Sequence, residues 1–171
     1  MTGQDLSEDP SGDLRRAASR VLERCRARGL TVATAESCTG GLVAGALTEI
    51  AGSSDMVDRG FVTYSDAAKR QMLGVNKKTL RKHGAVSQET AREMAKGALK
   101  RSRGTIAVAV TGVAGPTGGS AAKPVGTVCF SWRMEKTTRS ETQHFKGDRE
   151  SVRRQSVERA LEGVLELLDG G

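Results

Sequence analysis

The spacing of apolar residues along the chain predicts an alternation of helices and strands. Apolar residues recur every three or four positions from Leu14 to Cys25, the period of a helix with one buried face, and Gly29 ends that helix. The same period predicts helices at 41–50, 87–99 and 148–168. Short β-branched or continuously apolar segments predict strands at 30–35, 57–64, 105–110, 126–132 and 139–145.

Polar residues at expected helix starts add two short helices between the second and third strands. Ser65 and Asn76 can each cap one of them, and Ser87 can cap the longer helix that follows. Asp148 is the expected cap of the last helix. The resulting order, αβαβαααβββα, predicts an α/β fold with a mixed, mainly parallel sheet and helices on both faces. Residues 1–12 are predicted to be a disordered leader, and residues 13–171 a single domain.

Composition is that of an ordinary globular domain. The chain has 171 residues, 37% of them hydrophobic, and no apolar run approaches the roughly 18 residues of a membrane span. The N-terminus has neither the basic nor the apolar region of a secretory signal. Cys25, Cys38 and Cys129 form no C-x-x-C pair, and His83 and His144 stand far apart. We therefore expect a cytoplasmic protein with no disulfide, metal or membrane segment.

The formal net charge is +7, which raises the question of nucleic-acid binding. Residues 65–104 hold eleven basic and three acidic residues, but no aromatic side chain. Single-strand and RNA-binding modules depend on aromatic stacking, so the pattern favours solvated helix faces. Nucleic-acid binding remains an alternative, although an unlikely partner class on this pattern.

A first candidate site is the segment TAESCTGG at 34–41. Ser37 follows a strand and precedes a helix, which exposes its hydroxyl at the carboxyl end of the strand. The N–H groups of Cys38, Thr39, Gly40 and Gly41 could stabilise an oxyanion beside it. The structural alternative is that Ser37 is simply a helix N-cap.

A second candidate is the segment GFVTYSDAAK at 60–69. Tyr64 ends a strand and Lys69 lies in the first turns of the next helix. A serine nucleophile without a nearby histidine needs another base, which a lysine with a depressed pKa or a Tyr–Lys pair can supply. The alternative is a half-buried aromatic residue beside a solvated lysine.

Two further segments could hold an anionic ligand. The loop at 111–119 is rich in glycine and follows the apolar strand, so its backbone N–H groups could approach a phosphate or ribose. Arg149 and Arg153 share one helix face and could bind a phosphate. The alternatives are an ordinary mobile loop and a solvated basic helix face.

Taken together and in order, these motifs resemble a known family. The runs TAESCTGG, GFVTYSDAAK, HGAVS, VTGVAGPTGGS, KPVGTV and FKGDRESVRRQ are similar to the CinA C-terminal domain family over residues 13–168. The chain is closer still to its stand-alone bacterial members, the nicotinamide-nucleotide amidases, and we expect only the amidase half of the longer CinA proteins.

The resemblance implies a fold, an activity and site residues. The fold is a three-layer α/β/α sandwich found in oligomers, with a homodimer favoured here. The activity is hydrolysis of nicotinamide mononucleotide to nicotinate mononucleotide and ammonia, which recycles the pyridine ring of NAD, without a metal or other cofactor. The family nucleophile falls on Ser37, and its tyrosine and lysine fall on Tyr64 and Lys69.

Several points stay open at this stage. Lys69 could deprotonate Ser37 directly or through Tyr64, and the adjacent Cys38 thiol is a chemically possible nucleophile. A catalytically silent binding module is an alternative function. The residues expected to bind substrate are Cys38, Thr39, Gly40, Gly41, Thr111, Gly112, Ala114, Gly115, Arg149 and Arg153.

Overall fold

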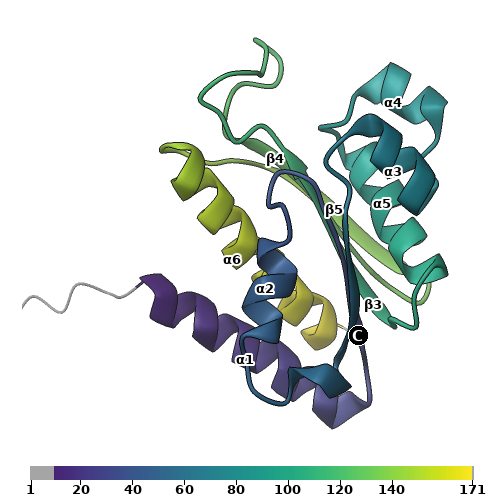
Figure 1. Ribbon diagram of the computed structural model, residues 1–171, viewed down its shortest axis with the longest axis vertical. Helices are drawn as coiled ribbons and strands as arrows, with labels where there is room; N and C mark the ends of the chain where they lie inside the picture. The colour runs from purple at the N-terminus through teal and green to yellow at the C-terminus, as the bar shows by residue number, and fades with distance from the viewer. Residues whose placement is uncertain (1–9, 171) are drawn as a thin grey trace, which may run out of the picture.

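The computed structural model describes residues 10–170, which form one sheet covered by helices on both faces (Figure 1). The strands of the described chain are β1 (Val32–Glu36), β2 (Val57–Val62), β3 (Ile106–Gly112), β4 (Thr127–Met134) and β5 (Thr137–His144). The helices are α1 (Pro10–Arg28), α2 (Leu42–Thr48), α3 (Asp66–Leu73), α4 (Lys77–His83), α5 (Gln88–Lys100) and α6 (Arg149–Asp169), with a short 3-10 turn at Ser53–Asp55.

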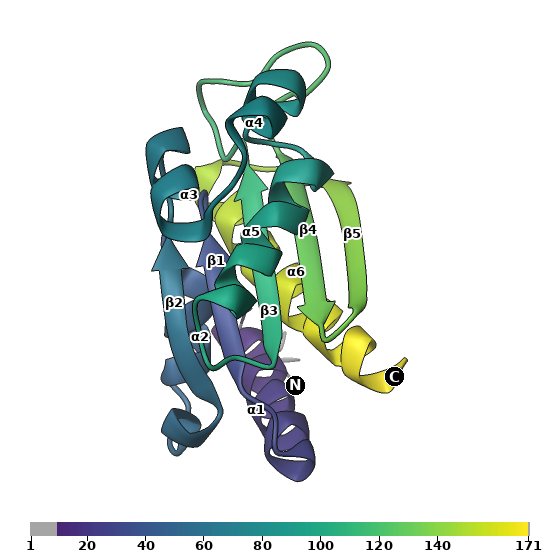
Figure 2. The same ribbon diagram turned by 90° about the vertical axis from the view of Figure 1, so that its right-hand side faces the viewer.

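The sheet has the strand order β2-β1-β3-β4-β5 (Figure 2). Strand β1 runs parallel to both β2 and β3, whereas β3 with β4 and β4 with β5 pair antiparallel. The sheet is therefore mixed as predicted, but the prediction of mainly parallel pairing is wrong because half of the four strand pairs are antiparallel. No helix lies between β3 and β4 or between β4 and β5, and parallel strands need a long crossover connection, usually a helix.

Two apolar cores separate three layers. Helices α1, α2 and α6 pack on one face of the sheet, and α3, α4 and α5 lie on the other (Figure 1). Strand β1 contributes side chains to both cores, since Val32 faces the first core while Ala33 and Ala35 face the second. The expected three-layer α/β/α sandwich is confirmed.

The predicted caps are confirmed by hydrogen bonds. Ser65, Asn76, Ser87 and Asp148 each accept a bond from an N–H group in the first turn of α3, α4, α5 and α6 respectively. Helix α1 begins at Pro10, so the end of the predicted leader is helical; proline is well tolerated in a first helical turn. Residues 1–9 of that leader lie outside the described residues.

The β4–β5 connection is shorter than the sequence predicts. Both strands extend inward until only Glu135 and Lys136 remain between Met134 and Thr137, which pair with each other. Glu135 has a φ of 53°, the left-handed conformation that tight two-residue hairpins need.

The topology sends two successive connections to opposite faces of the sheet. Helix α2 connects β1 to β2 on one face, and α3–α5 connect β2 to β3 on the opposite face. In open α/β sheets, ligands bind outside the carboxyl ends of strands where such connections diverge. Ser37 directly follows β1 at this point, and the 113–126 loop and α3 lie at the same end of the sheet (Figure 2). Within residues 10–170, no helix is long and apolar enough to cross a bilayer.

Candidate active site

The side chains of Ser37 and Lys69 meet at the carboxyl end of β1. Lys69 Nζ lies 3.0 Å from Ser37 Oγ, although the two residues are 32 positions apart in the chain. Ser37 continues the β1 ladder, because its N–H donates to the Val110 carbonyl at 2.9 Å. Lys69 comes from the first turns of α3, which Ser65 caps. Strand and helix thus hold the two groups in direct contact.

Lys69 is buried, contrary to the alternative of a solvated lysine. Only 1% of its surface is exposed, and Nζ also donates to the Thr63 carbonyl oxygen at 2.9 Å. Burial lowers the pKa of Lys69, while the nearby carboxylate of Asp66 and the thiol of Cys38 act in the opposite direction. A lysine whose neutral form is favoured in this way can accept a proton from a serine hydroxyl.

Ser37 is not a helix cap. The N-cap of α2 is Gly41, which has a φ of 104° and no capping side chain. The carboxylate of Glu36 takes over the capping role by accepting from the N–H groups of Val43 at 2.8 Å and Ala44 at 3.1 Å. Glu36 is 1% exposed, and its carboxylate also accepts from the Thr34 hydroxyl at 3.2 Å. Helix α2 is therefore capped without Ser37, whose hydroxyl faces Lys69.

Cys38 is a poor competitor for the nucleophilic role. Its side chain is buried in the apolar core between the sheet and α6. That burial raises the pKa of the Cys38 thiol to about 12, so the reactive thiolate is scarce near neutral pH. Of the two nucleophiles that the sequence left open, Ser37 and Cys38, the structure therefore favours Ser37.

Tyr64 and Arg149 meet at the rim of the site. Arg149 donates to the Tyr64 hydroxyl at 3.2 Å and to the Gly115 carbonyl at 2.8 Å, so it joins the end of β2 to the glycine-rich loop. Tyr64 is 64% exposed. Among the described residues its hydroxyl has no hydrogen bond to Ser37 or Lys69. The direct Ser37–Lys69 contact therefore favours proton transfer without Tyr64 as a relay.

These residues surround a pocket of about 370 Å³. Nine of the thirteen residues predicted from the sequence line it, namely Ser37, Cys38, Tyr64, Lys69, Thr111, Gly112, Ala114, Gly115 and Arg149. The glycine-rich loop forms much of one wall through residues up to Gly119. Lys123 fastens this loop by a hydrogen bond from its Nζ to the His83 carbonyl at the end of α4. The loop thus has a fixed attachment on the α3–α5 side of the sheet.

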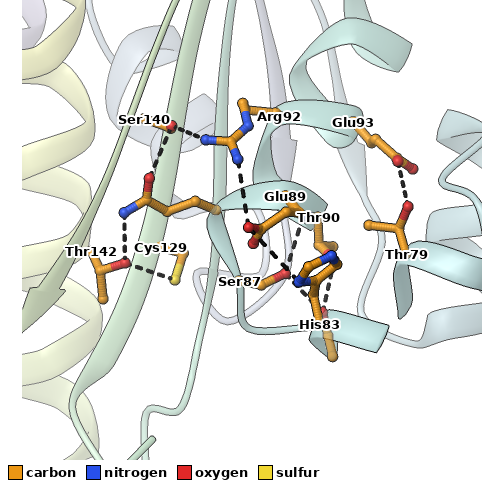
Figure 3. A network of polar contacts seen from close by, with 12 residues as sticks. Thr79, His83, Ser87, Glu89, Thr90, Arg92, Glu93, Cys129, Ser140 and Thr142 are labelled. Atoms are coloured by element: carbon orange, nitrogen blue, oxygen red, sulfur yellow. Dashed lines mark hydrogen bonds and ion pairs between the residues drawn. The ribbon is translucent and has the colours of Figure 1, made fainter. Parts of the chain in front are cut away.

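The segment between α4 and α5 also lines the pocket. Ala85 and Val86 line the pocket, and the Ala85 carbonyl accepts from the Thr111 hydroxyl at 2.8 Å. The hydroxyls of Ser87 and Thr90 both donate to the Gly84 carbonyl, at 3.0 and 2.7 Å. Figure 3 shows how this turn continues into a polar network reaching β4 and β5. The network holds this segment against the sheet.

That network has three further links to the sheet and one to α4. Gln88 donates to Thr142 and accepts from Ser140, while Arg92 donates to Ser140 at 2.6 Å (Figure 3). Glu89 Oε1 lies 3.8 Å from His83 Nδ1. The pKa of Glu89 is lowered mainly by a hydrogen bond from its own backbone N–H, and to a smaller extent by the nearby His83 ring.

Four predicted site residues do not line the pocket: Thr39, Gly40, Gly41 and Arg153. Thr39 is buried in the turn after Ser37. Arg153 reaches across from α6 and donates from Nε to the Cys38 carbonyl at 3.1 Å and from Nη2 to the Thr39 carbonyl at 3.4 Å. Its guanidinium therefore binds the backbone of the 38–41 turn, which follows the predicted nucleophile Ser37 and is called the nucleophile turn below.

Sequence reasoning missed other contributors to the site. Glu36 supports the nucleophile turn, the Thr63 carbonyl orients Lys69, and Asp66 lines the pocket. The signal for Glu36 was a charged residue at the end of an otherwise apolar strand, where only a buried partner can compensate the carboxylate. In the described part of the chain, no three His, Cys, Asp or Glu side chains are grouped to hold a metal ion.

Comparison with known proteins identifies the family of this chain. The family model described as "CinA C-terminal domain" matches residues 14–168. The chain belongs to the CinA C-terminal domain family. A solved member, the competence/damage inducible protein CihA from Agrobacterium tumefaciens, is 52% identical with a TM-score of 0.88 and covers 92% of this chain and 96% of its own.

Several relatives carry a functional name. The nicotinamide-nucleotide amidohydrolase PncC of Escherichia coli K12 is 54% identical over 153 residues, which is 88% of this chain and 92% of that protein. The protein of the same name from Pseudomonas putida is 51% identical over 150 residues, or 88% and 94% of the two chains. A CinA-like protein of Syntrophobacter fumaroxidans is 53% identical, but the match spans only 33% of its length.

Proposed function

We propose that this protein hydrolyses the carboxamide of nicotinamide mononucleotide, giving nicotinate mononucleotide and ammonia. The observation that carries the proposal is the buried contact between Ser37 and Lys69 in a pocket bordered by a glycine-rich loop. The amidohydrolase names of relatives that align over most of their length agree with it. The product would return the pyridine ring to NAD synthesis, and the predicted homodimer and cytoplasmic location belong to the same proposal.

In the first step, Ser37 Oγ attacks the carboxamide carbon while its proton passes to the neutral amine of Lys69. The 3.0 Å contact allows direct transfer, and the lowered pKa of Lys69 favours the neutral amine. The quaternary pyridinium withdraws electrons from the carboxamide, which makes its carbon a better electrophile than that of a simple amide. The tetrahedral oxyanion is stabilised by backbone N–H groups of the 38–41 turn.

In the remaining steps, Lys69 first donates a proton and then acts as a base again. As the C–N bond breaks, Lys69 returns the proton to the departing nitrogen, which leaves as ammonia and an acyl-Ser37 ester remains. Lys69, neutral again, takes a proton from a water molecule whose oxygen attacks the ester carbon. The C–O bond to Ser37 then breaks, and its Oγ recovers a proton from Lys69.

Remote parts of the nucleotide bind along the loop wall. Backbone N–H groups at 111–119 are suited to ribose and phosphate oxygens, and Arg149 supplies a positive charge at the rim. Tyr64, exposed beside Arg149, offers a ring and a hydroxyl to the substrate. Binding energy from the phosphate can assist the chemical step, which explains a preference for the nucleotide over free nicotinamide.

The decisive experiment is ammonia release from nicotinamide mononucleotide by the purified protein and by Ser37→Ala. We expect steady release by the wild type and a loss of at least about a thousandfold in kcat for the variant. Ser120→Ala is a serine control that should keep most of the activity, because Ser120 is exposed and lies just after the 111–119 loop. A wild type that releases no ammonia, or an equally active Ser37→Ala, would refute the proposal.

A further inference from the structure

The guanidinium of Arg153 binds two successive carbonyl oxygens of the nucleophile turn. Nε donates to the Cys38 carbonyl and Nη2 to the Thr39 carbonyl. The Thr39 carbonyl has a second donor, the Leu42 N–H at 3.0 Å, whereas Arg153 is the donor found for Cys38 among the described residues. The orientation of the peptide between Cys38 and Thr39 therefore depends on Arg153.

Because a peptide group is planar, fixing its carbonyl also fixes the direction of its N–H group. In a planar trans peptide, the C=O of one residue and the N–H of the next point in opposite directions. With its Cys38 oxygen fixed toward Arg153, the same peptide must direct the Thr39 N–H away from α6.

The direction away from α6 is the direction of the catalytic pair. Helix α6 belongs to one layer of the sandwich, and α3, which carries Lys69, belongs to the other (Figure 1). Ser37 reaches toward α3, where it meets Lys69. An N–H directed away from α6 therefore points toward the layer in which Ser37 meets Lys69, which is where the tetrahedral oxyanion would form.

Of the N–H groups in the turn, that of Gly40 is engaged, because it donates to the Ser37 carbonyl at 3.0 Å. In the described residues, no acceptor is found for the N–H groups of Cys38, Thr39 and Gly41. The Thr39 N–H is the one that belongs to the peptide whose Cys38 carbonyl Arg153 holds. A charged donor on the carbonyl of the same peptide also polarises this N–H and strengthens it as a donor.

We propose that Arg153 is a positioning residue that fixes the Cys38–Thr39 peptide so that the Thr39 N–H donates to the oxyanion. This inference rests on the proposed amidase function and departs from the sequence-based expectation that Arg153 holds the phosphate. A phosphate contact would contribute mainly to substrate binding, whereas an oxyanion donor acts in the transition state.

The test is to measure kcat and KM for nicotinamide mononucleotide with Arg153→Ala and Arg153→Lys. We expect kcat to fall by about ten- to a hundredfold in Arg153→Ala with KM within about twofold of wild type, because the donor remains but is no longer held. Added guanidinium at low millimolar concentration should restore part of the kcat of Arg153→Ala. Arg154→Ala is the matched control, since the neighbouring Arg154 pairs with Glu158 on the exposed side of α6.

The outcomes separate the two proposals. An active wild type with unchanged kcat in both Arg153 variants, or with KM alone raised, would overturn the positioning role and leave the amidase function standing. A wild type without ammonia release would end both. If Arg153→Ala loses its cooperative thermal transition, Arg153→Lys carries the test, because lysine keeps the charge but cannot hold both carbonyls.

Discussion

The carbonyl oxygen of Thr63 accepts a hydrogen bond from Nζ of Lys69, and this bond restricts how the amine can face Ser37. A neutral amine has two N–H groups and one lone pair. With one N–H directed to Thr63 at 2.9 Å, the lone pair can turn toward the Ser37 hydroxyl at 3.0 Å. Burial supplies the other requirement, because it lowers the pKa of Lys69 and so favours the neutral amine.

Lys69→Arg should abolish activity while keeping the positive charge. Arginine remains protonated at every accessible pH, so it cannot accept the serine proton. We expect kcat to fall by at least about a hundredfold, the lower range for loss of a general base. Lys77→Arg, on an exposed residue at the start of α4, is the control and should retain wild-type kcat. Substantial activity in Lys69→Arg would show that another group is the base.

Asp66→Asn should move the pH dependence of kcat/KM. The carboxylate of Asp66 raises the pKa of Lys69, so its removal lowers that pKa and increases the neutral fraction at a given pH. The limb on which activity rises with pH should therefore shift to lower pH. Asp55→Asn, in the 3-10 turn before β2, should leave the limb in place. A shift to higher pH in Asp66→Asn would contradict Lys69 as the titrating base.

Arg149→Met should weaken substrate binding more than it slows the chemical step. A charged hydrogen bond to a phosphate contributes about 1.5–3 kcal/mol, which corresponds to a roughly ten- to hundredfold increase in KM. Methionine keeps much of the side-chain volume but carries no charge. Initial rates over a range of nicotinamide mononucleotide concentrations would measure the effect, with Arg154→Met as the control. A normal KM in Arg149→Met would place the phosphate elsewhere.

Gly97→Ala and Gly45→Ala should change stability in opposite directions. Both glycines lie inside helices, where alanine is intrinsically favoured by about 1 kcal/mol. A Cβ at Gly97 would lie 2.0 Å from the Leu73 carbonyl oxygen, whereas one at Gly45 would meet nothing within 4 Å. We expect Gly97→Ala to lower the free energy of unfolding by about 1–3 kcal/mol or more, and Gly45→Ala to raise it by up to about 1 kcal/mol. Urea unfolding of both variants measures the difference.

Most of the fold was predictable because local signals and burial agree. The caps at Ser65, Asn76, Ser87 and Asp148 depend on side chains next to their own helices, so the sequence displays them directly. The antiparallel pairing of β3 with β4 was harder to predict from the sequence. Whether a strand runs parallel to its neighbour depends on the path of the connection between them, and residues 113–126 carry no periodic pattern that indicates it.

Most residues that line the pocket fall within motifs visible in the sequence, but their contacts do not. Ser37 and Lys69 fall within recognisable motifs, yet their contact is a tertiary property of β1 and α3. Arg153 has the spacing of a phosphate ligand on the helix face of Arg149, but its guanidinium donates to the Cys38 carbonyl. Glu36 was overlooked because its partners are backbone N–H groups, which every sequence contains.

The alternation of side chains along β1 restricts how the length of this strand can change in evolution. Glu36 faces the α2 layer and Ser37 the α3 layer because successive residues of a strand alternate between faces. Insertion or deletion of a single residue within Val32–Glu36 would exchange these directions, turning the carboxylate toward Lys69 and the hydroxyl into the apolar layer. The contact between Ser37 and Lys69 therefore fixes the number of residues in this strand, whereas loops away from the pocket face no such restriction.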